Sequence, residues 1–130
     1  MLANSKAFSG FAVDDPEQAK QFYGQTLGLT ITEVPDTGGL MQLQLAGDTH
    51  VLVYPKPDHV PATFTVLNFP VPDIEATVDA LAARGVRFER YEAMASDFDD
   101  KGIFRGGGPL IAWFTDPAGN VLSVLEQDAA

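Results

Sequence analysis

The segment WFTDPAGNVLSVLE, residues 113–126, carries the clearest strand and turn signals of this chain. Apolar residues alternate with others on both sides of DPAGN, which predicts two strands, 110–115 and 121–126, joined by a turn at 116–120. Alternation assigns the side chains to two faces. One face, suited to packing under a helix, holds Leu110, Ala112, Phe114, Leu122 and Val124; the other holds Ile111, Trp113, Thr115, Val121, Ser123 and Leu125.

Two helices are predicted from their apolar period and end signals. The first begins at Pro16 after the cap Asp15 and runs to Gly28; the second begins after Asp73 and ends at Gly85. The remaining strands are expected at 8–13, 29–34, 40–46 and 49–54 in the first half, and at 64–71 and 86–91 in the second. Both halves therefore have the order βαβββ.

The two halves align with each other. VDDPE at 13–17 matches VPDIE at 71–75, an offset of 58 residues, and HVLV at 50–53 matches NVLS at 120–123, an offset of 70. We predict an α+β fold in which two βαβββ modules, made by internal duplication, form a cupped mixed sheet with helices on the outer face. Residues 1–130 are expected to form one domain, with module one at 7–54, a proline-rich linker at 55–62 and module two at 63–127.

In the first hairpin, a two-residue turn at Gly47-Asp48 predicts the faces of both strands. The helix side is expected to hold Met41, Leu43, Leu45, Leu52 and Tyr54, and the opposite side Gln42, Gln44, Val51 and Val53. Glutamines on the inner side of a sheet are unusual in a closed core. A sheet covered by helices on one side, with polar and apolar groups on the other, suits a small-molecule site.

Composition limits the partners of this chain. The absence of cysteine excludes disulfides and thiolate zinc sites and fits a reducing compartment, so we expect a cytoplasmic location. No stretch approaches the roughly 20 apolar residues of a membrane helix, so no membrane partner is expected. A net charge of −10 repels phosphate backbones, so nucleic acid is not an expected partner. The same charge attracts cationic small molecules, although solubility alone also explains it.

Three segments carry a family resemblance: FAVDDPEQAKQFYGQTLGLTI (11–31), FPVPDIEATVDALAARGVRF (69–88) and WFTDPAGNVLSVLE (113–126). They resemble the vicinal oxygen chelate superfamily, which includes glyoxalase I, bleomycin-resistance proteins and extradiol dioxygenases. The resemblance covers nearly the whole chain and implies the duplicated fold. It also implies, for metal-dependent members, a divalent ion held by His, Gln or Glu side chains on the first and last strand of each module.

Those ligand positions correspond here to Phe8, Val53, Val66 and Ser123. Three of these side chains cannot coordinate a cation, and a neutral serine is a poor ligand for a divalent transition metal. A register shift of one residue brings no His, Glu, Asp or Gln to any of the four positions. We therefore expect no metal and no other cofactor.

The candidate ligand-binding residues are chosen for the side of the sheet away from the helices. Trp113 is expected to form the floor of the second module's cup, and buried amides require partners or a ligand. Arg105 pairs either with an anionic ligand or with the acidic loop around it. The full set is Phe8, Gln42, Gln44, Val53, Phe64, Val66, Asn68, Arg105, Trp113 and Ser123.

Two further features leave alternatives open. The segment 92–108 is either a binding lid with Gly106–Gly108 as its hinge or a solvated acidic loop. His50, placed on the helix side by the predicted turn, and His59, in the linker, are expected at surfaces or edges. No nucleophile and base occur together, so no catalytic residue is predicted.

The first hypothesis for function is a metal-free protein that binds a partly aromatic small molecule in the cup. It is similar to the antibiotic-sequestering members of the superfamily, which implies a homodimer. The alternatives are a glyoxalase-type lyase or isomerase, or a dioxygenase-related enzyme, with an unconventional metal site. Two more are a metal-independent lyase or isomerase with Asp97 as base, and an interaction module without small-molecule chemistry.

Overall fold

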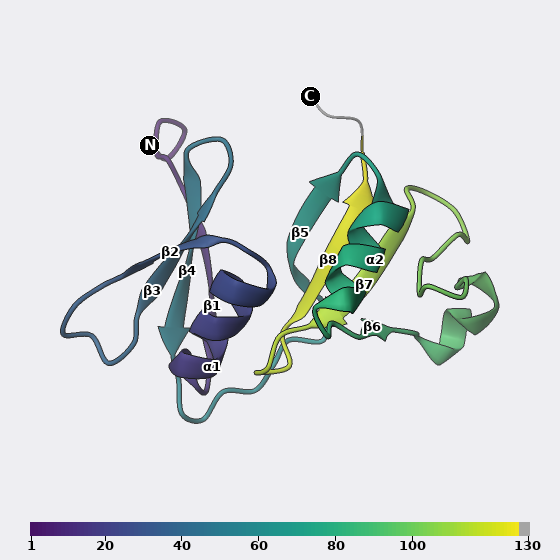
Figure 1. The fold of residues 1–130 in the computed structure, drawn as a ribbon. Helices are drawn as coiled ribbons and strands as arrows, with labels where there is room; N and C mark the ends of the chain where they lie inside the picture. Colours follow the sequence, from purple (N-terminus) through teal and green to yellow (C-terminus); the bar gives the residue numbers. More distant parts are fainter. Residues whose placement is uncertain (128–130) are drawn as a thin grey trace. The chain divides into compact units, whose positions relative to one another are not determined.

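The computed structural model describes residues 1–127 (Figure 1). The chain divides into two compact units, Met1–Val60 and the residues from Pro61 onward, so the boundary falls within the predicted linker. Each unit contains a four-stranded mixed sheet with a helix on one face, in the order strand, helix, strand, strand, strand. The α+β class and the two βαβββ modules are confirmed. The assignment of both modules to a single domain stays a prediction.

The first unit begins with a parallel strand pair and adds an antiparallel hairpin. Its elements are β1 (Ser9–Val13), α1 (Pro16–Gln21), the π-helix η1 (Phe22–Thr26), β2 (Thr30–Glu33), β3 (Met41–Leu45) and β4 (Thr49–Pro55), with the sheet order β1-β4-β3-β2. The Asp15 carboxylate caps α1 by accepting the backbone N–H groups of Glu17 and Gln18. The single helix expected from Pro16 onward becomes a π-helix at Phe22. The backbone hydrogen bond from Leu27 N–H to Phe22 O closes this π-helix.

The register of the first hairpin differs from the prediction. β3 and β4 pair Met41 with Val53 and Leu43 with Val51, so these four side chains share one face, where all are buried. The opposite face holds Gln42, Gln44, His50, Leu52 and, by alternation, Tyr54.

The predicted positions of Val51, Val53, Leu52, Tyr54 and His50 were therefore wrong. The cause is the turn: Leu45 pairs with Thr49, so three residues, 46–48, connect the strands instead of two. One extra residue reverses every side chain of β4.

The second unit repeats the plan. Its elements are β5 (Thr65–Val71), α2 (Ile74–Ala83), β6 (Phe88–Glu89), the 3-10 helix η2 (Glu92–Asp97), β7 (Ile111–Thr115) and β8 (Val121–Glu126), with the order β5-β8-β7-β6. The predicted faces of this hairpin are confirmed, because Ala112, Phe114, Leu122 and Val124 are all buried. Asp73 caps α2, and the Glu126 carboxylate of β8 accepts the Ile74 N–H at 3.1 Å, which ties the helix to the sheet.

The DPAGN turn is a hydrogen-bonded unit of its own. The buried Asp116 carboxylate accepts the backbone N–H groups of Ala118 and Asn120 and the side-chain amide of Asn120, each at 2.9 Å. Gly119 has a φ of 88°, which favours glycine. These bonds explain why this turn was readable from sequence.

No helix in the described part of the chain is long and apolar enough to cross a membrane. The longest regular helix is α2, with 10 residues.

Candidate ligand-binding site

Four aromatic side chains gather on the helix-free face of the second sheet, the face opposite α2. The rings of Tyr91, Phe98 and Phe104 surround Trp113, with centroids 5.4, 6.1 and 5.9 Å from the indole. These four residues form what we call the aromatic cluster. All four residues are half-buried, neither enclosed in the core nor fully exposed. Such a surface offers stacking contacts to a planar molecule.

The sheet holds Trp113 in a defined orientation. Trp113 on β7 pairs with Ser123 on β8, which pairs with Asn68 on β5, so the three lie in one row across the sheet. The indole N–H donates to Thr65 Oγ1 at 3.1 Å. The fully buried Ser123 hydroxyl donates to Asn68 Oδ1 at 2.6 Å. The structure thus brings together three of the predicted site residues, Asn68, Trp113 and Ser123.

The other rings of the aromatic cluster come from the segment between β6 and β7. Phe98 and Phe104 form a β-bridge with each other, and Phe104 also bridges Ile111 at the start of β7, with its N–H donating to Ile111 O at 2.7 Å. These two phenylalanines were not among the predicted site residues, because the prediction for this segment rested on its charged and glycine residues. Two phenylalanines in an otherwise polar loop were the available signal.

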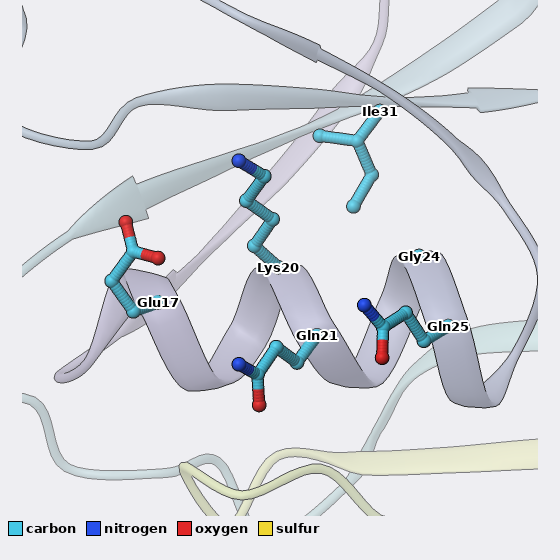
Figure 2. A pocket seen from close by; sticks show the side chains of 6 residues that line it. All are labelled: Glu17, Lys20, Gln21, Gly24, Gln25 and Ile31. Atoms are coloured by element: carbon cyan, nitrogen blue, oxygen red, sulfur yellow. The ribbon is translucent and has the colours of Figure 1, made fainter.

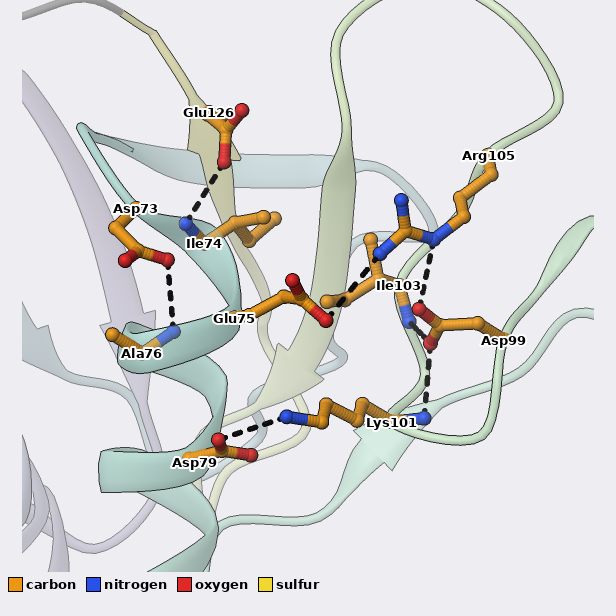
Figure 3. A network of polar contacts seen from close by, with 10 residues as sticks. All are labelled: Asp73, Ile74, Glu75, Ala76, Asp79, Asp99, Lys101, Ile103, Arg105 and Glu126. Carbon is orange, nitrogen blue, oxygen red and sulfur yellow. Dashed lines mark hydrogen bonds and ion pairs between the residues drawn. The ribbon is translucent and has the colours of Figure 1, made fainter.

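Asp99 is the centre of the hydrogen bonds that hold this segment (Figure 3). Its Oδ1 accepts the backbone N–H groups of Lys101 and Ile103, and its Oδ2 accepts Arg105 Nε, all at 2.9 Å. Partial burial acts to raise the pKa of the Asp99 carboxyl. The hydrogen bonds from Ile103, Arg105 and Lys101 outweigh it, so that the pKa lies below its usual value.

The segment is also attached to α2. The Ile103 side chain is fully buried, and Lys101 Nζ lies 2.9 Å from an Asp79 carboxylate oxygen of the helix. The Arg90 guanidinium donates to the carbonyl oxygens of Asp99 and Asp100 at 2.6 and 2.7 Å. These contacts attach the segment to the rest of the second unit. The two alternatives for it, a binding lid or a solvated acidic loop, stay predictions.

Arg105 belongs to these internal contacts. Its guanidinium pairs with Asp99 at 2.9 Å and with Glu75 of α2 at 3.7 Å. Of the two alternatives in the sequence, the structure shows the pairing with the acidic loop. We therefore do not retain Arg105 in the site.

Gly106 serves packing, because a Cβ there would lie 2.5 Å from the Phe104 ring.

The helix-free face of the first sheet has a different chemistry. Gln44 Nε2 donates to Thr32 Oγ1 at 3.1 Å and to Gln42 Oε1 at 3.3 Å. His50 lies opposite Gln44 on this face, and its ring packs on the exposed Phe8 ring at a centroid distance of 4.5 Å. The predicted residues Phe8, Gln42 and Gln44 are therefore together, and His50 joins them against expectation.

Three other predicted residues are placed differently. Val53 is fully buried on the helix side, so it is removed from the candidate site. Val66 lies at an irregularity of β5, where the register with β8 shifts between Thr65 and Leu67. Phe64 precedes β5 and is exposed. In the linker, His59 is half-buried, and its Nε2 has no hydrogen-bond partner among the described residues.

The comparisons with known proteins agree with this geometry. The model of the Glyoxalase/Bleomycin resistance protein/Dioxygenase superfamily matches residues 7–124. The chain belongs to this superfamily. No curated protein matches the chain in sequence.

Solved structures of the superfamily show the same fold. TnmS3, an antibiotic-binding protein from Streptomyces sp. CB03234, is 24% identical, with a TM-score of 0.69 over 96% of this chain and 98% of that one. A glyoxalase/bleomycin resistance protein from the same organism is 26% identical, with a TM-score of 0.62 over 92% and 99%. The glyoxalase family protein from Enterococcus faecalis is 20% identical, with a TM-score of 0.65 over 97% and 100%.

The residues of this superfamily member do not fit the metal centre of its metal-dependent relatives. In the observed register Val53 lies on the helix side, and its neighbour Leu52 lies on the helix-free face. The four positions that correspond to the metal ligands of the relatives therefore hold Phe8, Leu52, Val66 and Ser123. None is an imidazole or a carboxylate, and the Ser123 hydroxyl is bonded to Asn68. Within residues 1–127 no group of three or more His, Asp or Glu side chains is arranged to hold a metal ion.

A shallow groove in the first unit is lined by residues of α1, η1 and β2 (Figure 2). It has a volume of about 310 Å³ and is lined by Glu17, Lys20, Gln21, Gly24, Gln25 and Ile31. Lys20 is engaged with Glu33 at 3.2 Å, and the lining glutamines are exposed. This groove lacks the aromatic surface and the buried polar groups of the second unit.

Proposed function

We propose that this protein binds a small molecule with a planar aromatic group, which stacks on the aromatic cluster without a metal ion. The observation that carries the proposal is the group of four half-exposed rings around Trp113, held by a structured loop. Preorganised aromatic surface binds at low entropic cost because the rings are already ordered. Large half-exposed rings on one face are typical of binding sites.

A polar group in the same row of the sheet as Trp113 supports the same proposal. Asn68 Oδ1 accepts the Ser123 hydroxyl, which fixes the orientation of the amide. Its Nδ2 has no hydrogen-bond partner in the described residues, and Asn68 is exposed. The free N–H groups would donate to an acceptor on the ligand, such as a carbonyl oxygen. The site therefore suits a ligand that is partly aromatic and partly polar.

We propose an antibiotic or a similar aromatic metabolite as the ligand class, with sequestration as the role. TnmS3 is described as an antibiotic-binding protein, and its fold covers nearly all of this chain. The lack of fitting metal ligands at Phe8, Leu52, Val66 and Ser123 supports binding without metal-dependent chemistry.

A ligand screen tests the proposal. Trp113 is the only tryptophan, so its fluorescence reports directly on the aromatic cluster. We expect at least one planar aromatic antibiotic to quench Trp113 saturably and to raise Tm, because a ligand that binds the folded state stabilises it by about 2.7 kcal/mol at 100 times its Kd. Phe104→Ala should weaken that binding, and Phe22→Ala, in the first unit, should leave it unchanged. The proposal fails if a broad panel of aromatic antibiotics and metabolites gives no saturable quenching.

We also propose that the protein is a homodimer. Phe8, Tyr54, Val60 and Phe64 expose large apolar side chains, and such surface is commonly covered by a partner. Sedimentation equilibrium at micromolar concentration should give twice the mass of 13.9 kDa. A single species of 13.9 kDa would refute the dimer.

A further inference from the structure

Glu89 lies beside the aromatic cluster. β6 and β7 pair Glu89 directly with Trp113, and directly opposed residues of antiparallel strands point to the same face. Phe88 points the other way, where its ring contacts the buried Phe114 ring at 5.7 Å. Tyr91, two residues after Glu89, contacts Trp113. The Glu89 carboxylate is therefore on the helix-free face, at the edge of the aromatic cluster.

The electrostatics agree with this placement. Burial raises the pKa of the Tyr91 phenol, and the negative charge of Glu89 raises it further. Glu89 itself is half-buried. The neighbouring Arg90 is bonded to the carbonyl oxygens of Asp99 and Asp100, and no Lys or Arg of the described chain forms an ion pair with Glu89.

An unpaired carboxylate and half-buried aromatic rings favour the same kind of ligand. The faces of aromatic rings carry partial negative charge and attract cations, and a half-buried carboxylate attracts them more strongly than a fully solvated one. The net charge of −10 increases the local concentration of cations around the protein.

We infer that the site prefers planar aromatic ligands that carry a positive charge, and that Glu89 pairs with the cationic group. This inference rests on the proposed function, and it adds the charge of the ligand and the residue that selects it. Glu89 is a specificity residue that the sequence alone did not indicate.

Three tricyclic probes of similar shape test the inference: 9-aminoacridine, which is a cation at neutral pH, neutral acridone, and anionic acridine-9-carboxylate. Their affinities are measured by Trp113 quenching and by calorimetry on the full chain. We expect 9-aminoacridine to bind most tightly. Glu89→Gln should weaken it about 10-fold and leave acridone unchanged, since only the cation contacts the carboxylate. Glu89→Lys should shift the preference toward acridine-9-carboxylate.

Glu92→Gln is the matched control, because it removes the same charge from an exposed position in η2. An equal loss of affinity for 9-aminoacridine in Glu89→Gln and Glu92→Gln would assign the effect to net charge and overturn the inference. Equal affinities for the three probes, unchanged in Glu89→Gln, would also overturn it while the proposed function stands. If no probe quenches Trp113, the inference is wrong for this class of ligand, and the screen of other aromatic compounds decides the proposed function separately. Circular dichroism melting confirms that each variant is folded.

Discussion

The helix-free faces of the two sheets share one backbone plan and differ in chemistry. The first exposes hydrogen-bonded amides, Gln42 and Gln44, with His50 beside them, whereas the second exposes rings around Trp113. The strand order is equivalent in the two units. The difference comes from the connection before the last hairpin. In the first unit it spans only residues 34–40, and in the second it is the long segment that carries Phe98 and Phe104.

The two units show how one backbone plan carries two different surfaces. The sheet positions a tryptophan, but an insertion at the sheet edge supplies the remaining rings and the contacts that hold them. Ile103, buried against the second unit, and Asp99, bonded within the loop, are the residues on which that insertion depends. Substitutions in the loop and in the sheet separate the contributions of the two.

Ile103→Ala should have the largest effect. It empties a fully buried position of the loop, which typically costs about 2–5 kcal/mol of the free energy of unfolding. Urea unfolding followed by circular dichroism measures the loss. Ile31→Ala, at a half-buried position in the first unit, is the control and should cost less. Equal losses would mean that Ile103 does not anchor the loop.

Asp99→Ala should have the next largest effect. It leaves the backbone N–H groups of Lys101 and Ile103 and the Nε of Arg105 without the acceptor Asp99, at a cost of about 1–3 kcal/mol, largely local to the loop. Trp113 emission should shift to longer wavelength as Phe98 and Phe104 loosen. Asp100→Ala removes an adjacent exposed carboxylate and should leave the emission unchanged. An unshifted emission in Asp99→Ala would show that the sheet alone orders the rings.

The loop should also loosen in acid. Because the pKa of Asp99 is lowered in the folded state, its contribution to stability is fully present above the unfolded value of about 3.9 and is lost as the pH falls through the folded pKa. The near-UV circular dichroism of Trp113 should therefore decrease below about pH 4. Asp99→Asn should reduce this dependence, and a wild-type profile in that variant would assign the acid effect to other carboxyl groups.

Gln44→Leu should have the smallest effect. It removes the bonds to Thr32 and Gln42 on a partly solvated face, a change of about 0.5 kcal/mol in the free energy of unfolding. Trp113 fluorescence and the affinity for the aromatic probe should be unchanged. A weaker affinity would show that the first sheet also takes part in binding, and the contrast between the two faces would need revision.

Much of the fold was readable from local sequence signals. The caps Asp15 and Asp73, the apolar period of the helices and the DPAGN turn predicted the elements and their order, because each signal acts within a few residues. Short-range signals did not settle the length of the turn at 46–48. The turn has one residue more than predicted. This extra residue places Val53 and His50 on the faces opposite to the predicted ones, since side chains in a strand alternate.

The sequence alone predicted the duplicated α+β plan, the shared face of Trp113 and Ser123, and the misfit with a metal centre of the superfamily. Only the tertiary structure showed that Tyr91, Phe98 and Phe104 surround Trp113, that Arg105 is occupied by Asp99 and Glu75, and that Glu89 lies unpaired at the edge. The positions of the helices and strands follow from the apolar period and the capping residues, which are local signals. The position of a long loop follows from where its buried side chain and hydrogen bonds find partners elsewhere in the chain, and no local pattern specifies those partners.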